Sequence, residues 1–367
     1  MTYIYQHHDW PRFTWDTEAL AQQLGAARLR QGRLLGRMSA LGLAFQDEAM
    51  LSSLTEEAIK TSEIEGEILD ADQVRSSVAR HLGLDVGGAS RVDRHVDGLV
   101  EMMMDATQNH GARLTAERLH AWHGALFPTG RSGLKRIRTA AWRDAAADPM
   151  QVISGTAGRE RVHFEAPRAE ALEQEMSAFL DWYNGATDMD GVLKAALAHL
   201  WFVTLHPFED GNGRVARAIA DMALAQSEKS GQRFYSMSAQ IRAERKAYYD
   251  ILERTQKGGL DITPWLTWFL GCLDRAFAHA EKVLATVIEK SKFWERHAAV
   301  PFNARQRMML TRLLEGFAGK LTSSKWAKLG KCSQDTAGRD IDELVQRGIL
   351  VKDAAGGRST SYSLKGL

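Results

Sequence analysis

The stretch from His206 to Arg217 reads HPFEDGNGRVAR and lies between two segments with helical apolar patterns. Gly211 and Gly213 bracket a polar residue immediately before the second of these helices. Backbone amides in such a bend, together with the N-terminus of a helix, favour a bound anion. Arg214 and Arg217 would oppose the dipole of that helix at a cost of roughly 0.3–1 kcal/mol each, which a bound polyphosphate would offset. The stretch therefore predicts a polyphosphate-binding loop.

Two further residues of this stretch suit the chemistry of phosphates. Asp210 is an acidic residue beside the loop, where it could hold Mg²⁺ against phosphate oxygens. His206 ends the preceding helix and can act as a general base near neutral pH. The alternative is a Gly/Asn turn with solvated arginines. We favour the site because every residue of the string has a role in one reaction.

The string matches HxFx(D/E)GNGRxxR at every fixed position, so the chain resembles the Fic family. The chain has neither a Walker A loop nor a Rossmann fingerprint. The resemblance implies a mainly α fold, with a Fic helical core and a short β-hairpin flap. It implies a protein adenylyltransferase that uses ATP and Mg²⁺ and transfers AMP to a Ser, Thr or Tyr hydroxyl of a target protein.

The resemblance also implies roles for single residues. His206 would deprotonate the target hydroxyl, and Asp210 would position Mg²⁺. The phosphates would be bound by the loop and by the start of the following helix, which comprise Asp210, Gly211, Asn212, Gly213, Arg214, Val215, Ala216 and Arg217.

β-branched runs around a glycine-containing turn predict a hairpin over Gln151–Phe164. It occupies the place of the family's flap, which holds the target segment by strand-like pairing; the flap residues are Val152, Ile153, Ser154 and Gly155. A plain surface hairpin is the alternative. Similar enzymes place residues around the adenine where Tyr248, Tyr249 and Gln256 stand, although paired tyrosines also suit a core. His199 is expected to be a core histidine rather than a metal ligand.

The segment Thr61–Gly66 matches the family's inhibitory pattern, (S/T)xxxE(G/N). We expect a helix that starts at the capping-box pattern Ser53–Glu56 and runs past Glu65. Thr61 and Glu65 would then share one helix face, from which the carboxylate could pair with Arg217 in place of the γ-phosphate of ATP. A solvated acidic helix is the alternative. In some relatives the same glutamate supports removal of AMP.

Composition limits the remaining possibilities. The chain has 367 residues, 44% of them apolar, and a net charge of +1. Its two cysteines, Cys272 and Cys332, have no metal or disulfide spacing. We see no signal peptide and no span for a membrane, so a cytoplasmic protein is expected. From Phe302 onward the net charge is +6, which indicates a separate module.

We divide the chain into an N-terminal helical region carrying the inhibitory motif (1–85), a Fic catalytic core (86–289) and a C-terminal module (302–367). Helical patterns and a final hairpin make this module resemble a winged helix-turn-helix. If it binds DNA, Gln334, Thr336 and Arg339 would face the major groove and Arg358 a phosphate. Such modules also dock proteins or form dimers, and a homodimer is implied by the family resemblance alone.

These observations leave three readings open: an autoinhibited adenylyltransferase, a DNA-binding regulator that senses nucleotide, and a Fic enzyme with another nucleotide donor or with deAMPylation activity. The intact His206 favours the first, because a sensor would need no general base.

Overall fold

The computed structural model describes residues 2–84, 91–155, 159–314, 317, 319–353 and 360–365. The chain forms two compact units, Met1–Ala280 and Glu281–Leu367. The expected mainly helical fold is confirmed, since the described strands are few and short. No helix among the described residues is long and apolar enough to cross a membrane.

The first unit opens with a short 3-10 turn, η1 (Ile4–Gln6), and three helices: α1 (Thr17–Ser39), α2 (Leu43–Ile64) and α3 (Ala71–Leu82). The expected start of a helix at Ser53 was wrong, because α2 begins ten residues earlier and buries Leu51 and Leu54. The expectation that it runs past Glu65 was also wrong. Glu65 caps α2, and Gly66 at φ +86° turns the chain away.

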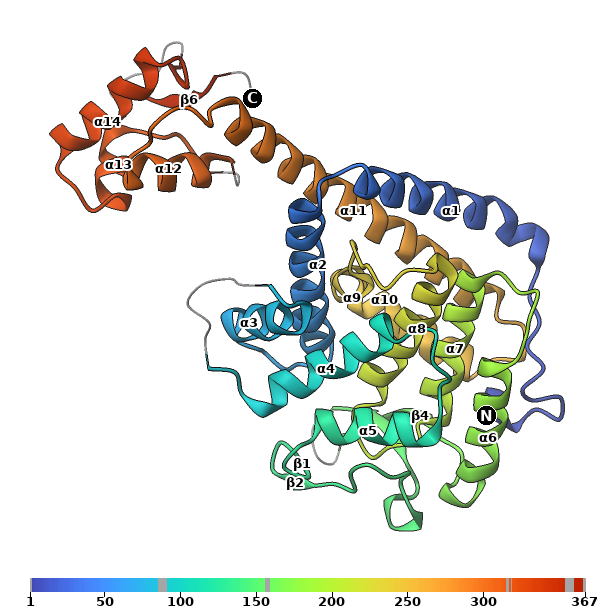
Figure 1. Ribbon diagram of the computed structural model, residues 1–367. Coiled ribbons are helices and arrows are strands. Elements are labelled where there is room, and N and C mark those ends of the chain that lie inside the picture. The colour runs from blue at the N-terminus through green and yellow to red at the C-terminus, as the bar shows by residue number, and fades with distance from the viewer. Residues whose placement is uncertain are drawn as a thin grey trace. The chain divides into compact units, whose positions relative to one another are not determined.

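The core of this unit is the pair α7 (Gly191–Leu205) and α8 (Asn212–Glu228), which pack against each other. Nearly every residue of α7 is buried, as its continuous apolar sequence requires. The helices α4 (Arg94–Gln108), α5 (Ala116–Leu126) and α6 (Leu172–Asn184) pack against this pair (Figure 1). The short 3-10 turns η2 (Ala145–Ala147) and η3 (Ala169–Ala171) lie in the connections.

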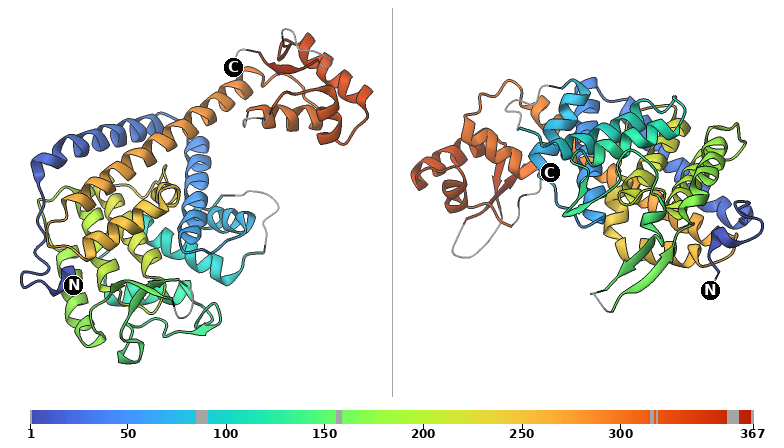
Figure 2. Two further views of the ribbon diagram at one scale, coloured as in Figure 1. Left: turned by 180° about the vertical axis from the view of Figure 1, so that it is seen from behind. Right: turned by 90° about the horizontal axis from the view of Figure 1, so that it is seen from below.

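The predicted hairpin is confirmed as the antiparallel pair β3 (Gln151–Ser154) and β4 (Arg161–Glu165), which projects from the helices in the right-hand view of Figure 2. A second small hairpin, β1 (Arg131–Ser132) and β2 (Lys135–Arg136), was not predicted. Two-residue strands in a basic stretch carry no alternating pattern by which they could be recognised.

Two helices follow α8: α9 (Met237–Ala243) and α10 (Arg245–Gln256). Glu244 separates them and accepts two hydrogen bonds from Arg275, which lies on α11 (Thr263–Arg296). Trp265 of α11 is fully buried and donates its indole N–H to the Ala196 carbonyl of α7.

The second unit contains α12 (Ala304–Leu314), α13 (Ser323–Leu329) and α14 (Gln334–Gln346), followed by the antiparallel pair β5 (Leu350–Lys352) and β6 (Tyr362–Leu364). These elements enclose their own core around the fully buried Trp326. Thr322 and Ser333 cap α13 and α14 through their hydroxyls.

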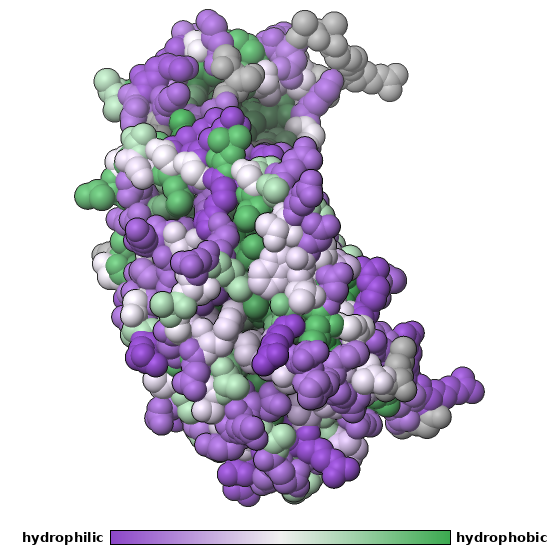
Figure 3. Space-filling view, turned by 90° about the vertical axis from the view of Figure 1, so that its right-hand side faces the viewer, coloured by the Kyte–Doolittle hydropathy of each residue, from purple (hydrophilic) through white to green (hydrophobic). Residues whose placement is uncertain are grey.

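On the face of the chain drawn in Figure 3, polar side chains predominate and apolar ones are scattered.

Gly98 lets α4 approach α5, because a Cβ at this position would lie 1.9 Å from the Ala125 carbonyl oxygen. We predict that Gly98→Ala lowers the free energy of unfolding by about 1–3 kcal/mol or more, since neither backbone can move away cheaply. Thermal unfolding followed by circular dichroism measures this loss. Gly32→Ala in α1 is the control, because no heavy atom lies within 4 Å of its added methyl group; an equal loss in both variants would contradict the packing argument.

Candidate active site

The loop between α7 and α8 is closed on itself by one amide side chain. Asn212 accepts from the Phe208 N–H at 2.9 Å and donates to the Phe208 carbonyl at 2.8 Å, and it is buried. Gly211 has φ +81°, and a Cβ there would lie 2.8 Å from a ring carbon of Phe127. The loop therefore needs both a side-chain amide and a glycine, as its sequence provides.

His206 caps α7 in the left-handed region, at φ 50°. Its backbone carbonyl accepts from Arg143 Nε at 2.9 Å, and its ring Nδ1 lies 3.3 Å from the Val203 carbonyl. Because a carbonyl only accepts, Nδ1 carries the proton and Nε2 carries the lone pair. Burial lowers the pKa of His206 to about 4. The ring is therefore neutral at physiological pH and able to accept a proton.

The Asp210 carboxylate accepts from the Gly211 N–H at 2.6 Å and from the Ser132 hydroxyl on β1. No group of three His, Cys, Asp or Glu side chains in the described residues is arranged to hold a metal. Mg²⁺ often takes only one or two protein carboxylates, with phosphate oxygens and water as its other ligands. The Asp210 carboxylate thus fits the role of the protein ligand to Mg²⁺.

Arg217 is buried, and its guanidinium contacts the end of α2. Nε donates to the Thr61 hydroxyl at 2.7 Å, and Nη2 donates to the Thr61 carbonyl at 3.0 Å and to Glu65 Oε1 at 2.7 Å. Nη1 is buried and has no partner among the described residues. The predicted contact between Glu65 and Arg217 is thus present in the geometry, although it comes from the helix cap rather than from the helix face.

The Glu65 carboxylate also lies against the N-terminus of α8. A Cβ added to Gly213 would lie only 2.3 Å from Glu65 Oε1. Only a glycine leaves room for an oxygen at this place, where the helix dipole favours an anion. A carboxylate therefore lies where the loop sequence predicts phosphate oxygens.

Arg214 is held by a second carboxylate that the sequence analysis missed. Its Nη1 lies 3.0 Å from Glu67 Oε2, and its guanidinium stacks over Phe127 at 5.1 Å. Glu67 Oε1 lies 2.5 Å from His95 Nε2, and this contact lowers the pKa of Glu67 and raises that of His95. Glu67 directly follows the Thr61–Gly66 pattern, and this proximity was the only available signal.

A cavity of about 740 Å³ brings many of the predicted residues together. His206 and Gly213 line it beside Glu65. The predicted residues that also line it, from the flap and from α10, are Val152, Ile153, Ser154, Tyr248, Tyr249 and Gln256. The predicted residues that do not line it are Thr61, Gly66, Gly155, Asp210, Gly211, Asn212, Arg214, Val215, Ala216 and Arg217.

Several of the predicted residues contribute to the packing of the core. Val215 and Ala216 are fully buried within α8. Tyr248 is buried and its hydroxyl lies 2.9 Å from His199 Nε2, so His199 is a hydrogen-bonded core histidine, as expected. Gln256 donates to Thr204 Oγ1 at 3.3 Å.

Two buried side chains that support the loop had no signal in the sequence. Arg143 bonds the His206 carbonyl, and its own N–H donates to the Pro207 carbonyl at 2.8 Å. His123 stacks on Phe208 with ring centroids 4.1 Å apart, accepts from the Ala140 N–H at Nδ1, and lies 3.2 Å from the Asp210 carbonyl through Nε2. Both come from segments remote in sequence, where a lone arginine or histidine gives no pattern.

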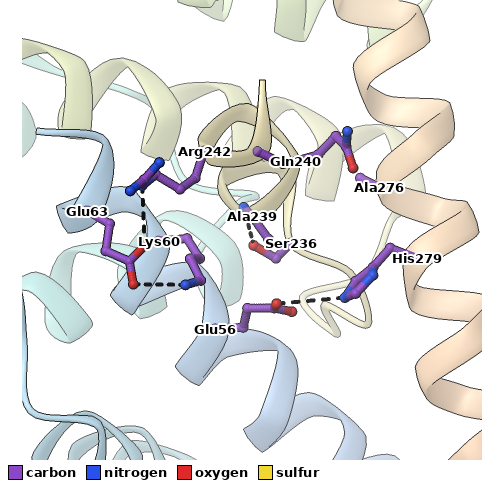
Figure 4. Close-up of a pocket in the computed structure, with 10 residues that line it drawn as sticks. Glu56, Lys60, Glu63, Ser236, Ala239, Gln240, Arg242, Ala276 and His279 are labelled. Atoms are coloured by element: carbon purple, nitrogen blue, oxygen red, sulfur yellow. Dashed lines mark hydrogen bonds and ion pairs between the residues drawn. The ribbon is translucent and has the colours of Figure 1, made fainter. Parts of the chain in front are cut away.

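A second cavity of about 330 Å³ is lined by α2, α9 and α11 (Figure 4). Its charged side chains pair with one another: Glu63 lies 2.8 Å from Lys60 Nζ and 3.3 Å from Arg242 Nε. Glu56 and His279 are 3.7 Å apart. Arg242 lines both this cavity and the larger one.

In the second unit, the side chains expected to contact DNA bases are partly engaged. The Gln334 amide donates to Ser324 Oγ at 2.9 Å, and the Thr336 hydroxyl bonds Ser333 Oγ. Arg339 is exposed, and Arg358 lies outside the described residues. Among the described residues of this unit, no specific contact therefore favours DNA over a protein partner.

Two family models match the chain. Residues 113–224 match the Fic/DOC family, and residues 3–84 match a domain of unknown function, DUF4172. Protein adenylyltransferase Fic of Nematostella vectensis is 32% identical over 111 residues, 30% of this chain and 24% of that protein. Its namesake in Culex quinquefasciatus is 33% identical over 102 residues, 27% of this chain and 19% of that protein. The matches thus span a quarter or less of these relatives.

Solved structures share the fold. A Fic family protein from Desulfovibrio desulfuricans superposes over 97% of this chain and 98% of its own, with a TM-score of 0.55 at 20% identity. A Fic domain containing signaling protein from Bacteroides thetaiotaomicron covers 71% of this chain and 97% of its own, with a TM-score of 0.52 at 21% identity. Residues 113–224 of the first unit, which include the loop between α7 and α8, thus match the Fic/DOC family and are similar in sequence to the protein adenylyltransferases named Fic.

Proposed function

We propose that this chain is a protein adenylyltransferase, which transfers AMP from ATP to a Ser, Thr or Tyr hydroxyl of a target protein, and that Glu65 restrains it. One observation carries the proposal: a neutral His206 and the glycine at the start of α8 line one cavity of about 740 Å³. That volume lies within the range of pockets that bind small ligands and cofactors. The names of the matched relatives support AMP over other donors.

The reaction follows from these positions. The target hydroxyl, placed beside the exposed edge of the flap, gives its proton to His206 Nε2 while its oxygen attacks the α-phosphorus of ATP. The bond to the bridging oxygen breaks and pyrophosphate leaves. The amides at the start of α8 and the guanidinium of Arg217 stabilise the charge on the departing phosphates. Mg²⁺ held by Asp210 would neutralise phosphate charge when it is bound.

The restraint is a competition between two anions. The Arg217 guanidinium donates a hydrogen bond to Glu65, and the same carboxylate lies against Gly213 at the start of α8. The terminal phosphate of ATP needs the same guanidinium and the same helix end. While Glu65 stays in place, ATP binds weakly or with its α-phosphate out of line. If the chain also removes AMP from modified target proteins, Glu65 would take part in that reaction from the same position.

Removing the restraint gives the first activity prediction. Glu65→Gly should raise transfer of labelled AMP to lysate proteins by roughly 5- to 150-fold, the range of a coupling of 1–3 kcal/mol. Glu63→Gly is the matched control, because Glu63 pairs with Lys60 and Arg242 and makes no contact with Arg217. Equal stimulation by both variants would show that loosening α2, rather than removing the carboxylate, is responsible.

We also expect AMP transfer to depend on His206 as the general base. In the Glu65→Gly background, His206→Ala should lower AMP transfer by about 10²–10⁴-fold, the usual contribution of general base catalysis. If the chain were a DNA-binding nucleotide sensor, no AMP transfer would depend on His206. Undiminished AMP transfer by the variant would therefore refute catalysis by His206.

The pH dependence follows from the lowered pKa of His206. Because burial favours the neutral ring, kcat/KM should stay level as the pH falls from 8 to about 5 and should decrease only as the pH approaches about 4. The initial rate of AMP transfer by Glu65→Gly at each pH measures this, with circular dichroism to confirm that the protein stays folded. A decrease centred near the ordinary histidine pKa of about 6.5 would contradict the burial argument.

A further inference from the structure

The N-terminal segment ahead of α1, residues 3–16, contacts the flap through aromatic rings. Tyr3 and Tyr5 both lie nearly perpendicular to the ring of Phe164 on β4, with centroids 5.1 and 6.1 Å from it. The two tyrosine rings also stack on each other at 5.9 Å. Phe164 is buried, and it lines the cavity of about 740 Å³ together with Val152 of β3. One ring therefore joins the N-terminal segment to the wall of the cavity.

The N-terminal segment is itself fixed to the helical core of the first unit. His7 Nε2 lies 3.1 Å from the Gly258 carbonyl, just beyond the end of α10. Trp10 donates its indole N–H to Glu175 of α6 at 2.9 Å. Thr14 forms a β-bridge with the connection between α10 and α11. Because none of these three anchors is on the flap, the tyrosines have a fixed place from which they can position it.

The flap needs such a support because its own strand pairing is interrupted. Val152 pairs with Phe164, but the next residue of β3, Ile153, pairs with Val162, so His163 is an extra residue in β4. An extra residue of this kind bends a strand and disrupts the hydrogen bonds of the pair locally. A hairpin of two strands is also marginally stable by itself. The rings that pack on Phe164 lie next to this irregularity, where they can set the direction of the outer part of the flap.

A second set of contacts ties the flap to α10. Arg161 Nη2 and His163 Nδ1 lie 2.9 and 2.6 Å from the two carboxylate oxygens of Glu253. The Arg161 side chain is 70% exposed, so its ion pair contributes little to the position of the flap. The contacts on Phe164 involve a buried ring, whose packing does not depend on salt. We therefore expect the aromatic contacts to be the more important support.

We propose that Tyr3 and Tyr5 are positioning residues, which act through Phe164 to set the flap for the target segment. The inference rests on the proposed function, in which the target hydroxyl lies beside the flap edge. Without the two rings, only a fraction of the molecules hold the flap in the position that binds the target, and the apparent affinity for the target falls by that fraction. The start of the stretch that matches DUF4172 thereby gains a role in target recognition, separate from the restraint by Glu65.

The test compares the full chain carrying Glu65→Gly with the same chain carrying also Tyr3→Ala and Tyr5→Ala. Initial rates of AMP transfer from ATP labelled at the α-phosphate are measured over a series of lysate protein concentrations. We expect the half-maximal lysate concentration to rise about tenfold, which corresponds to about 1.4 kcal/mol, the order of one aromatic pair. The maximal rate and the affinity for a non-hydrolysable ATP analogue should stay unchanged. Hydrogen exchange should become faster in β3 and β4 and not in α8.

Two matched controls separate positioning from a general loss of stability. Tyr3→Phe with Tyr5→Phe keeps both rings and should behave as the parent. Trp10→Phe removes the hydrogen bond to Glu175 elsewhere on the same segment, and it should leave the half-maximal lysate concentration unchanged. Should the double alanine variant fail to fold, Tyr3→Leu with Tyr5→Leu keeps apolar side chains without the ring contacts and should show the same shift.

The outcomes distinguish this inference from the proposed function. An unchanged half-maximal lysate concentration overturns the inference and leaves the proposed function standing. Equal losses in the maximal rate and in the affinity for the ATP analogue, without a shift in the half-maximal lysate concentration, show a structural role only and overturn it as well. Absence of AMP transfer to any protein by Glu65→Gly overturns both.

Discussion

A buried guanidinium must have an anion beside it, and this requirement organises the candidate active site. Arg217 lies on α8, close to the loop between α7 and α8, with only 4% of its side chain exposed. An unpaired charge at such a place costs several kcal/mol, commonly 3–5 kcal/mol when a partner is removed. Without nucleotide, Glu65 supplies the anion, and Thr61 accepts two further hydrogen bonds. The end of α2 therefore docks on α8, and we propose that the phosphates of ATP take its place there.

The docked end of α2 is held at several points, so the restraint that we propose for Glu65 would involve a larger set of contacts. Arg245 of α10 donates to the Ile64 carbonyl at 2.7 Å. Further back along α2, the buried Glu57 accepts from the Ser236 hydroxyl and the Ser238 N–H at the start of α9. Because α10 also lines the cavity of about 740 Å³, the end of α2 is anchored to a wall of that cavity. Binding and release of the restraint are thus expected to be thermodynamically coupled.

Part of the candidate site could be predicted from the sequence alone. The loop was predictable because its glycines, amide and arginines are adjacent, and each has a local physical reason. The partner of Arg217 was predictable from a short pattern, but the bounds of α2 were not. Tertiary packing extends the helix toward its N-terminus, and Gly66 at φ +86° follows the cap at its other end. Arg143 and His123 join segments distant in sequence to the loop. Their meeting is decided by the packing of helices and flap, which no local pattern encodes.

The central claim is that Glu65 and the terminal phosphates compete for Arg217 while the rest of the cavity is unaffected. Calorimetric titration of the unmodified chain and of Glu65→Gly with a non-hydrolysable ATP analogue and with AMP tests it most directly. The account predicts that the substitution tightens binding of the ATP analogue by roughly 5- to 150-fold and leaves the affinity for AMP unchanged. Equal tightening for both nucleotides, or none for the ATP analogue, would contradict it.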